Sequence, residues 1–133
     1  MTLIMTPSLR NALYLDAAGS TPIGLAFAVA PGTFAGLFAL PQPLLIAVAV
    51  FIVGWVALLV AAARRPAIPR SFGWTFVVGN VVWMAASFAL LLSGLVQPNL
   101  FGTLFVIAQA LAVGLFALLQ WLAIRAPSAV AAR

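Results

Sequence analysis

The chain has 133 residues, of which 66% are hydrophobic and 5% are charged, and its mean hydropathy is +1.27. Soluble domains carry about 25% charged residues, so this composition excludes a water-soluble globular protein. Six arginines stand against one acid, Asp16, and the absence of histidine and cysteine excludes imidazole and thiol chemistry, so we expect a non-enzymatic protein without a cofactor or a metal site.

Four stretches of the sequence are long and apolar enough to cross a membrane as helices. A span needs about 20 apolar residues, because the hydrocarbon core is about 30 Å thick and each helical residue rises about 1.5 Å. The predicted spans are 12–30, 42–63, 72–96 and 100–124, separated by proline, glycine and arginine residues. The expected fold is therefore all-α, with a single four-helix transmembrane domain over 1–133.

A shorter apolar stretch, 33–40, lies between the first two predicted spans. It is too short to cross the bilayer and is bounded by Pro31 and Pro41. We predict an interfacial half-helix that places Phe34, Leu37 and Phe38 at the lipid boundary.

Two segments of the chain resemble each other. Residues 53–65 and 113–125 share a valine, a glycine, an Ala-Leu-Leu run, a later alanine and a final arginine at a constant offset. One interpretation is a duplication that produced two helical hairpins of the same orientation. The other is that Ala- and Leu-rich helices match by composition alone.

The arginines predict the orientation of the chain in the membrane. With four spans they all fall on one face, whereas the two loops on the other face carry no charge. Arginine-rich loops stay in the cytoplasm, so we predict that both termini are cytoplasmic and that the protein lies in a bacterial inner membrane. Topology then explains the net charge of +5 without a nucleic-acid partner. The residues concerned are Arg10, Arg64, Arg65, Arg70, Arg125 and Arg133.

Few polar side chains lie inside the predicted spans. Helical rise from the nearest arginine places Asp16, Asn80 and Gln120 at one depth, about 8–15 Å into the helices, with Trp83 near the same level. These four residues are the predicted polar layer of the bundle. Asp16 is either structural, paired with an arginine or bonded to Asn80, or it is a protonatable coupling site. Trp55 is expected to face lipid or a partner.

Small residues recur on the first predicted span. Ser20, Gly24 and Ala28 follow Asp16 at intervals of four residues, so they form one ridge on a helix. Small side chains allow helices to approach closely, which is a main source of helix association in lipid. The ridge therefore predicts a contact between helices. In the surrounding lipid bilayer, we expect the protein to form a homo-oligomer or part of a larger membrane complex.

Several short motifs carry a family resemblance. They are Leu15-Asp16-Ala17-Ala18-Gly19 with Gly24-Leu25, Leu40-Pro41, Asn80-x-x-Trp83 with Ser87, Gln109-Ala110, and Leu119-Gln120. Through them nearly the whole chain resembles a group of uncharacterised bacterial four-helix integral membrane proteins, which are distantly DoxX-like. The resemblance implies a four-helix membrane architecture but does not imply any activity.

A second resemblance is local. Asp16-Ala-Ala-Gly19-Ser20-Thr21 is similar to the acid-x-x-Gly-Thr/Ser segment on the first helix of small multidrug resistance transporters. In that family the acid is a glutamate that exchanges protons for a cationic substrate, so the resemblance implies a coupling role for Asp16. The chain departs from the pattern in having aspartate, and the family's aromatic residues have no clear match.

The leading functional prediction is a non-enzymatic integral membrane protein, an accessory or structural subunit that packs with itself or with a larger membrane complex. The near-absence of reactive side chains and the small-residue ridge favour it. The alternative is a small proton-coupled exporter of hydrophobic cations that uses Asp16.

Overall fold

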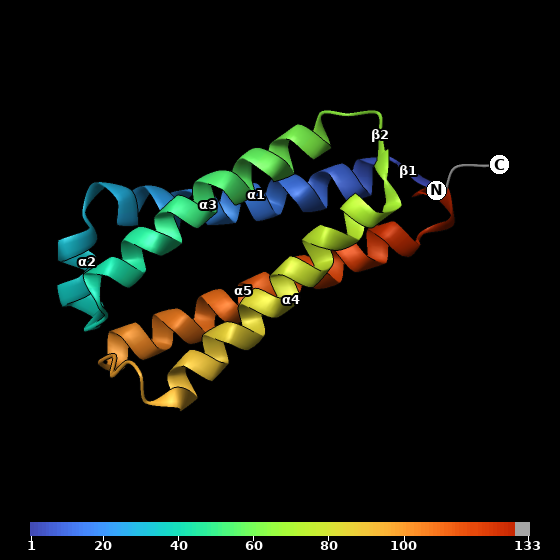
Figure 1. Cartoon of the computed structure of the whole chain (residues 1–133). Coiled ribbons are helices and arrows are strands. Elements are labelled where there is room, and N and C mark those ends of the chain that lie inside the picture. The colour runs from blue at the N-terminus through green and yellow to red at the C-terminus, as the bar shows by residue number, and fades with distance from the viewer. Residues whose placement is uncertain (130–133) are drawn as a thin grey trace.

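The computed structural model of the chain describes residues 1–129 and confirms the all-α fold, with a short helix and a small sheet in addition to the long helices (Figure 1). Four of the described helices are long and apolar enough to cross a membrane, so the chain is a multi-pass membrane protein. They are α1 (Pro7–Val29), α3 (Gln42–Ala63), α4 (Arg70–Ser93) and α5 (Leu100–Arg125). The shorter elements are β1 (Thr2–Ile4), α2 (Pro31–Phe38), β2 (Ala67–Pro69) and the 3-10 turn η1 (Pro127–Ala129).

Helix α1 begins at Pro7, earlier than the start at residue 12 that hydropathy predicts. Thr6 caps it, because the Thr6 Oγ1 accepts a hydrogen bond from the backbone N–H of Leu9 at 3.2 Å. Pro7 then occupies the first helical turn, where its missing N–H is not needed. A hydropathy window overlooks this turn because it contains polar residues such as Arg10.

The loop between α4 and α5 has a specific cap on each side. Helix α4 ends at Ser93, before the predicted end at residue 96, because Gly94 adopts a left-handed conformation with φ of 74°. Asn99 caps α5 by accepting a hydrogen bond from the Gly102 N–H at 2.9 Å. The Asn99 Nδ2 also donates to the Leu37 carbonyl at 2.8 Å, which ties this loop to α2.

The long helices form two antiparallel pairs, α1 with α3 and α4 with α5 (Figure 1). The backbones of the two pairs approach each other chiefly through α1 and α5, whereas within residues 1–129 α3 and α4 lie further apart and meet through large aromatic side chains. A duplication with two-fold symmetry would make these two inter-pair contacts equivalent. The two pairs agree with two hairpins, but their mutual packing is not symmetric.

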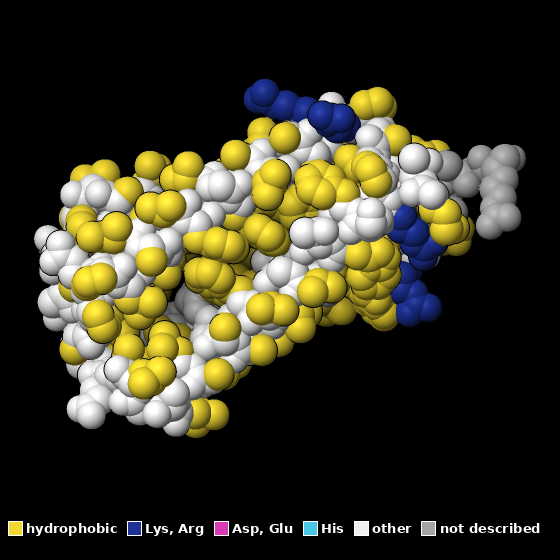
Figure 2. Space-filling view, in the orientation of Figure 1, with side chains coloured by type: hydrophobic (Ala, Val, Ile, Leu, Met, Phe, Trp, Pro, Cys, Tyr) yellow, Lys and Arg dark blue, Asp and Glu magenta, His cyan; other side chains and the backbone are white. Residues whose placement is uncertain are grey.

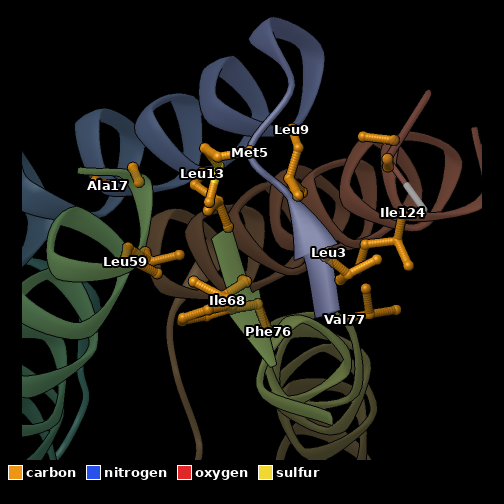
Figure 3. Packing of buried hydrophobic residues seen from close by; sticks show 14 residues of the cluster. Leu3, Met5, Leu9, Leu13, Ala17, Leu59, Ile68, Phe76, Val77 and Ile124 are labelled. Carbon is orange, nitrogen blue, oxygen red and sulfur yellow. The ribbon is translucent and has the colours of Figure 1, made fainter. Parts of the chain in front are cut away.

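A two-stranded sheet closes one end of the bundle. Strand β1 pairs antiparallel with β2, with Leu3 opposite Ile68. Both side chains are buried and pack against Leu9, Phe76 and Ile124, so the N-terminal strand is held in the core at this end (Figure 3). Hydropathy predicts spans and does not detect this sheet.

The described arginines gather at the same end as the sheet (Figure 2). The Arg10 Nε donates to the Ala63 carbonyl at 3.0 Å and so satisfies the C-terminal end of α3. The Arg125 guanidinium lies 4.9 Å from the centre of the Trp121 ring, a cation–π contact. Arg133 lies outside the described residues.

The opposite end of the bundle is closed by α2. The Phe38 ring is buried there and stacks on Phe105 of α5 with ring centroids 4.7 Å apart. Phe27 of α1 lies against Phe34 and Phe38, at 5.7 Å and 6.4 Å. Thus α2 packs its phenylalanines into the bundle, and of the three residues predicted at the lipid boundary Leu37 is the exposed one.

Candidate intramembrane polar site

Asp16 is completely buried, at 0% exposure, and three neutral side chains hold its carboxylate. The Asp16 Oδ2 accepts hydrogen bonds from the Asn80 Nδ2 at 2.7 Å and from the Gln120 Nε2 at 2.8 Å. The Oδ1 accepts from the Ser20 Oγ at 3.2 Å. The predicted depth of Asp16, Asn80 and Gln120 thus corresponds to direct contact between α1, α4 and α5.

A further hydrogen bond closes the group into a ring. The Asn80 Nδ2 also donates to the Gln120 Oε1 at 3.1 Å, so both of its hydrogens are used. Within residues 1–129 every deeply buried side-chain nitrogen and oxygen has a partner. Interhelical hydrogen bonds of this kind contribute about 0.6–2 kcal/mol each in a membrane, so the ring is a substantial link between the two helix pairs.

The structure decides between the two structural interpretations of Asp16. A structural Asp16 is expected either to pair with an arginine or to bond to Asn80. The structure shows the bond to Asn80, and the described partners of Asp16 are all uncharged. The nearest candidate cation on α1, Arg10, is bonded to a backbone carbonyl. We name Asp16, Ser20, Asn80 and Gln120 the Asp16 cluster.

Trp83 belongs to a different group from the one that helical rise suggests. Its Nε1 donates to the Gln109 Oε1 at 2.9 Å, and the Gln109 Nε2 donates to the Ser87 Oγ at 2.9 Å and to the Val106 carbonyl at 2.9 Å. The Ser87 Oγ donates to the Trp83 carbonyl at 2.8 Å. This Trp83 cluster lies one or two turns beyond Asn80 on α4 and leaves no donor of its own members free.

The small-residue ridge on α1 serves two separate contacts. A Cβ atom on Gly24 would lie 2.6 Å from the Ile52 Cγ2, so this glycine is needed for the close approach of α1 and α3. Ser20 belongs to the Asp16 cluster instead. Ala28 is exposed. The ridge is therefore used within the bundle along part of its length.

A cavity of about 200 Å³ lies between the two helix pairs and is lined by residues of α1, α3, α4 and α5. Its wall is mostly apolar, and a hollow with hydrophobic sides is visible in the space-filling view (Figure 2). Polar side chains from both clusters reach the wall, namely Ser20, Asn80, Trp83, Ser87 and Gln109.

Aromatic rings line one side of this cavity. Phe51 stacks on Trp83 with centroids 5.0 Å apart and on Trp55 at 5.8 Å. The Trp55 ring also covers Gly79, where a Cβ atom would lie 2.5 Å from it. Trp55 is half-buried and packs within the bundle, contrary to the expectation that it faces lipid or a partner. Its sequence context, an apolar helix, gave no signal for this.

The arrangement offers little reactive chemistry. No group of three or more His, Cys, Asp or Glu residues occurs among the described residues, so those residue types provide no metal site there. Comparison with protein-family models, curated proteins and solved structures finds no match to the chain.

Proposed function

We propose that the chain is a non-enzymatic integral membrane protein that acts as an accessory or structural subunit, packing with itself or with a larger membrane complex. One observation carries the proposal: the only acidic side chain of the chain is fully buried and hydrogen-bonded to Ser20, Asn80 and Gln120. A carboxylate with three neutral donors joins helices, and its contacts favour a structural role.

The proposed setting is a bacterial inner membrane with the arginine-bearing end in the cytoplasm. The described arginines lie at the end that carries the β1–β2 sheet, and this asymmetry supports cytoplasmic termini (Figure 2). The outer helix faces carry large exposed apolar side chains. In a membrane such faces contact lipid or neighbouring subunits, and no nucleic-acid partner is needed to explain the positive charge.

Affinity purification tests this proposal directly. A tagged copy is extracted from membranes in mild detergent and analysed by size exclusion with light scattering and by mass spectrometry. We expect either a stoichiometric membrane partner or a defined homo-oligomer. A tagged Gly24→Leu copy, in which the packing of α1 on α3 is disturbed, is the matched control. An assembly that needs an intact bundle should be weakened in this variant. A stable monomer without a partner, both in detergent and after crosslinking in membranes, contradicts the proposal.

A second candidate function is proton-coupled export of hydrophobic cations, which one observation favours. Ser20 and Asn80 both line the cavity and both bond to Asp16, so the carboxylate lies directly behind the cavity wall. A cation in the cavity would be close enough to compete for that carboxylate. The local similarity to small multidrug resistance transporters agrees with this proposal.

Proton release distinguishes the two functions. Hydrophobic cations are added to purified protein in weakly buffered detergent over about pH 6–9, and protons are counted with a pH dye. An exporter releases protons in wild type and none in Asp16→Asn, whereas the subunit proposal predicts no difference between the two proteins. Proton release that depends on Asp16 would contradict the subunit proposal and support the exporter.

A further inference from the structure

One buried acceptor in the cavity wall lacks a partner. Both hydrogens of the Asn80 amide are donated, to Asp16 and to Gln120, and within residues 1–129 the Asn80 Oδ1 forms no hydrogen bond. Asn80 is only 3% exposed, yet this oxygen is not among the fully enclosed atoms, all of which have partners. Asn80 lines the cavity, and because Asp16 and Gln120 occupy its amide nitrogen, the oxygen is the polar atom left for a molecule bound there.

The orientation of the Asn80 amide is fixed by its neighbours. Turning the amide over would place its oxygen 2.7 Å from a carboxylate oxygen of Asp16 and 3.1 Å from the Gln120 Oε1. Three acceptors would then face one another without a proton between them, which is unfavourable in a buried site. The cavity therefore receives the acceptor side of Asn80.

The other cavity-lining members of the two polar clusters add no free donor. The Ser20 hydroxyl is donated to Asp16, and the N–H and O–H groups of Trp83, Ser87 and Gln109 are all used within the Trp83 cluster. Trp55, across the cavity on α3, keeps its indole N–H without a partner within residues 1–129. A molecule that satisfies Asn80 must consequently bring its own O–H or N–H.

We propose that this cavity binds a small, uncharged aromatic molecule that carries a hydroxyl group, of the phenol class, with the hydroxyl donating to the Asn80 Oδ1. The volume of about 200 Å³ exceeds the ~150 Å³ of an apolar cavity that accommodates benzene. The rings of Phe51, Trp55 and Trp83 on one wall suit a flat aromatic guest.

The test compares two probes of similar shape, in one of which a methyl group replaces the donated proton. Purified protein is titrated with 4-bromophenol or with 4-bromoanisole, and binding is followed by bromine quenching of tryptophan fluorescence, since Trp55 and Trp83 line the cavity. We expect saturable quenching by the phenol and about five- to tenfold weaker binding of the methyl ether, which lacks the proton for Asn80. Equal affinity for the two probes overturns the proposal.

Matched variants locate the site. Val113→Phe fills the cavity without removing a hydrogen bond, whereas Val82→Phe makes the same change at a valine that is 59% exposed and outside the lining. The first should abolish saturable binding and the second should leave it unchanged. Asn80→Leu, where it purifies as a monodisperse protein, should remove the preference for the phenol. Binding that survives Val113→Phe places the site elsewhere and contradicts the proposal.

Discussion

The Gln120 Nε2 donates a hydrogen bond to the Asp16 Oδ2 at 2.8 Å, and this single bond joins the first and last spanning helices of the chain. Asn80 brings α4 to the same carboxylate oxygen at 2.7 Å. In the described part of the chain α3 and α4 meet instead through aromatic rings, with Phe51 stacked on Trp83 and Trp55 against Phe76. The Asp16 cluster is therefore a polar link between the pairs that adds to their shared apolar core and aromatic contacts.

Removal of the Asp16 carboxylate should destabilise the bundle strongly. Asp16→Ala leaves the donors of Asn80 and Gln120 without their shared acceptor, and we expect a loss of about 2–3 kcal/mol in unfolding free energy. Asp16→Asn keeps one acceptor oxygen and should lose about 1 kcal/mol. Unfolding in mixed detergent, followed by circular dichroism, measures both values.

The matched control for this measurement is Asn11→Ala, a polar truncation at an exposed position of the same helix. It should change the free energy of unfolding by less than about 0.5 kcal/mol. If Asp16→Ala were as stable as Asn11→Ala, the structural role of the Asp16 cluster would be wrong.

The sequence was sufficient for features that depend on local length and composition. Span length and hydropathy predict four helices, and helical rise from the arginines predicts a common depth for Asp16, Asn80 and Gln120, which the structure brings into contact. Helical rise fixes depth but not the rotation of one helix against another. The pairing of Trp83 with Gln109 depends on that rotation, so the sequence could not predict it.

The features that escaped prediction arise from contacts between distant segments. The strand pairing of Leu3 with Ile68 joins two three-residue strands that carry no periodic signal. The cavity lies between the two helix pairs, and its shape depends on side-chain fit across the whole bundle. Apolar sequence alone likewise does not separate the half-buried Trp55 from a lipid-facing residue.

Close packing of α1 on α3 should depend on Gly24. Gly24→Leu places a side chain where Ile52 already lies, and we expect a loss of about 1–3 kcal/mol, whereas Leu25→Phe, at a position that is 60% exposed, should be near neutral. A double-mutant cycle of Gly24→Ala with Ile52→Ala should show coupling, because truncating Ile52 makes room for the added methyl group. Additive effects in the cycle would contradict a direct contact.

The two ends of the bundle should lie on opposite sides of the membrane. The chain has no cysteine, so Gly36→Cys on α2 and Ser128→Cys near the arginine end each create a single labelling site. A Cβ on Gly36 has no neighbour within 4 Å, so the substitution is tolerated sterically. A membrane-impermeant maleimide applied to intact cells should label the first and not the second; labelling of both or of the second alone would refute cytoplasmic termini.

The N-terminal strand should contribute to stability out of proportion to its length. Leu3 is fully buried, opposite Ile68 and against Gly73, where a Cβ atom would lie 2.5 Å from the Leu3 Cδ1. Leu3→Ala opens a cavity in this packed end and should cost about 2–4 kcal/mol, whereas Ile4→Ala, at a neighbouring position that is 43% exposed, should cost less than about 1 kcal/mol. Thermal unfolding of the two variants in detergent measures the difference.

Hydrogen exchange should show the loss of protection for Leu3→Ala first at the amide of Met5, which donates to the Pro66 carbonyl at 2.9 Å, and at the amide of Arg70. Equal stability of the two variants would mean that the strand is not part of the core that holds α1 and α4 together.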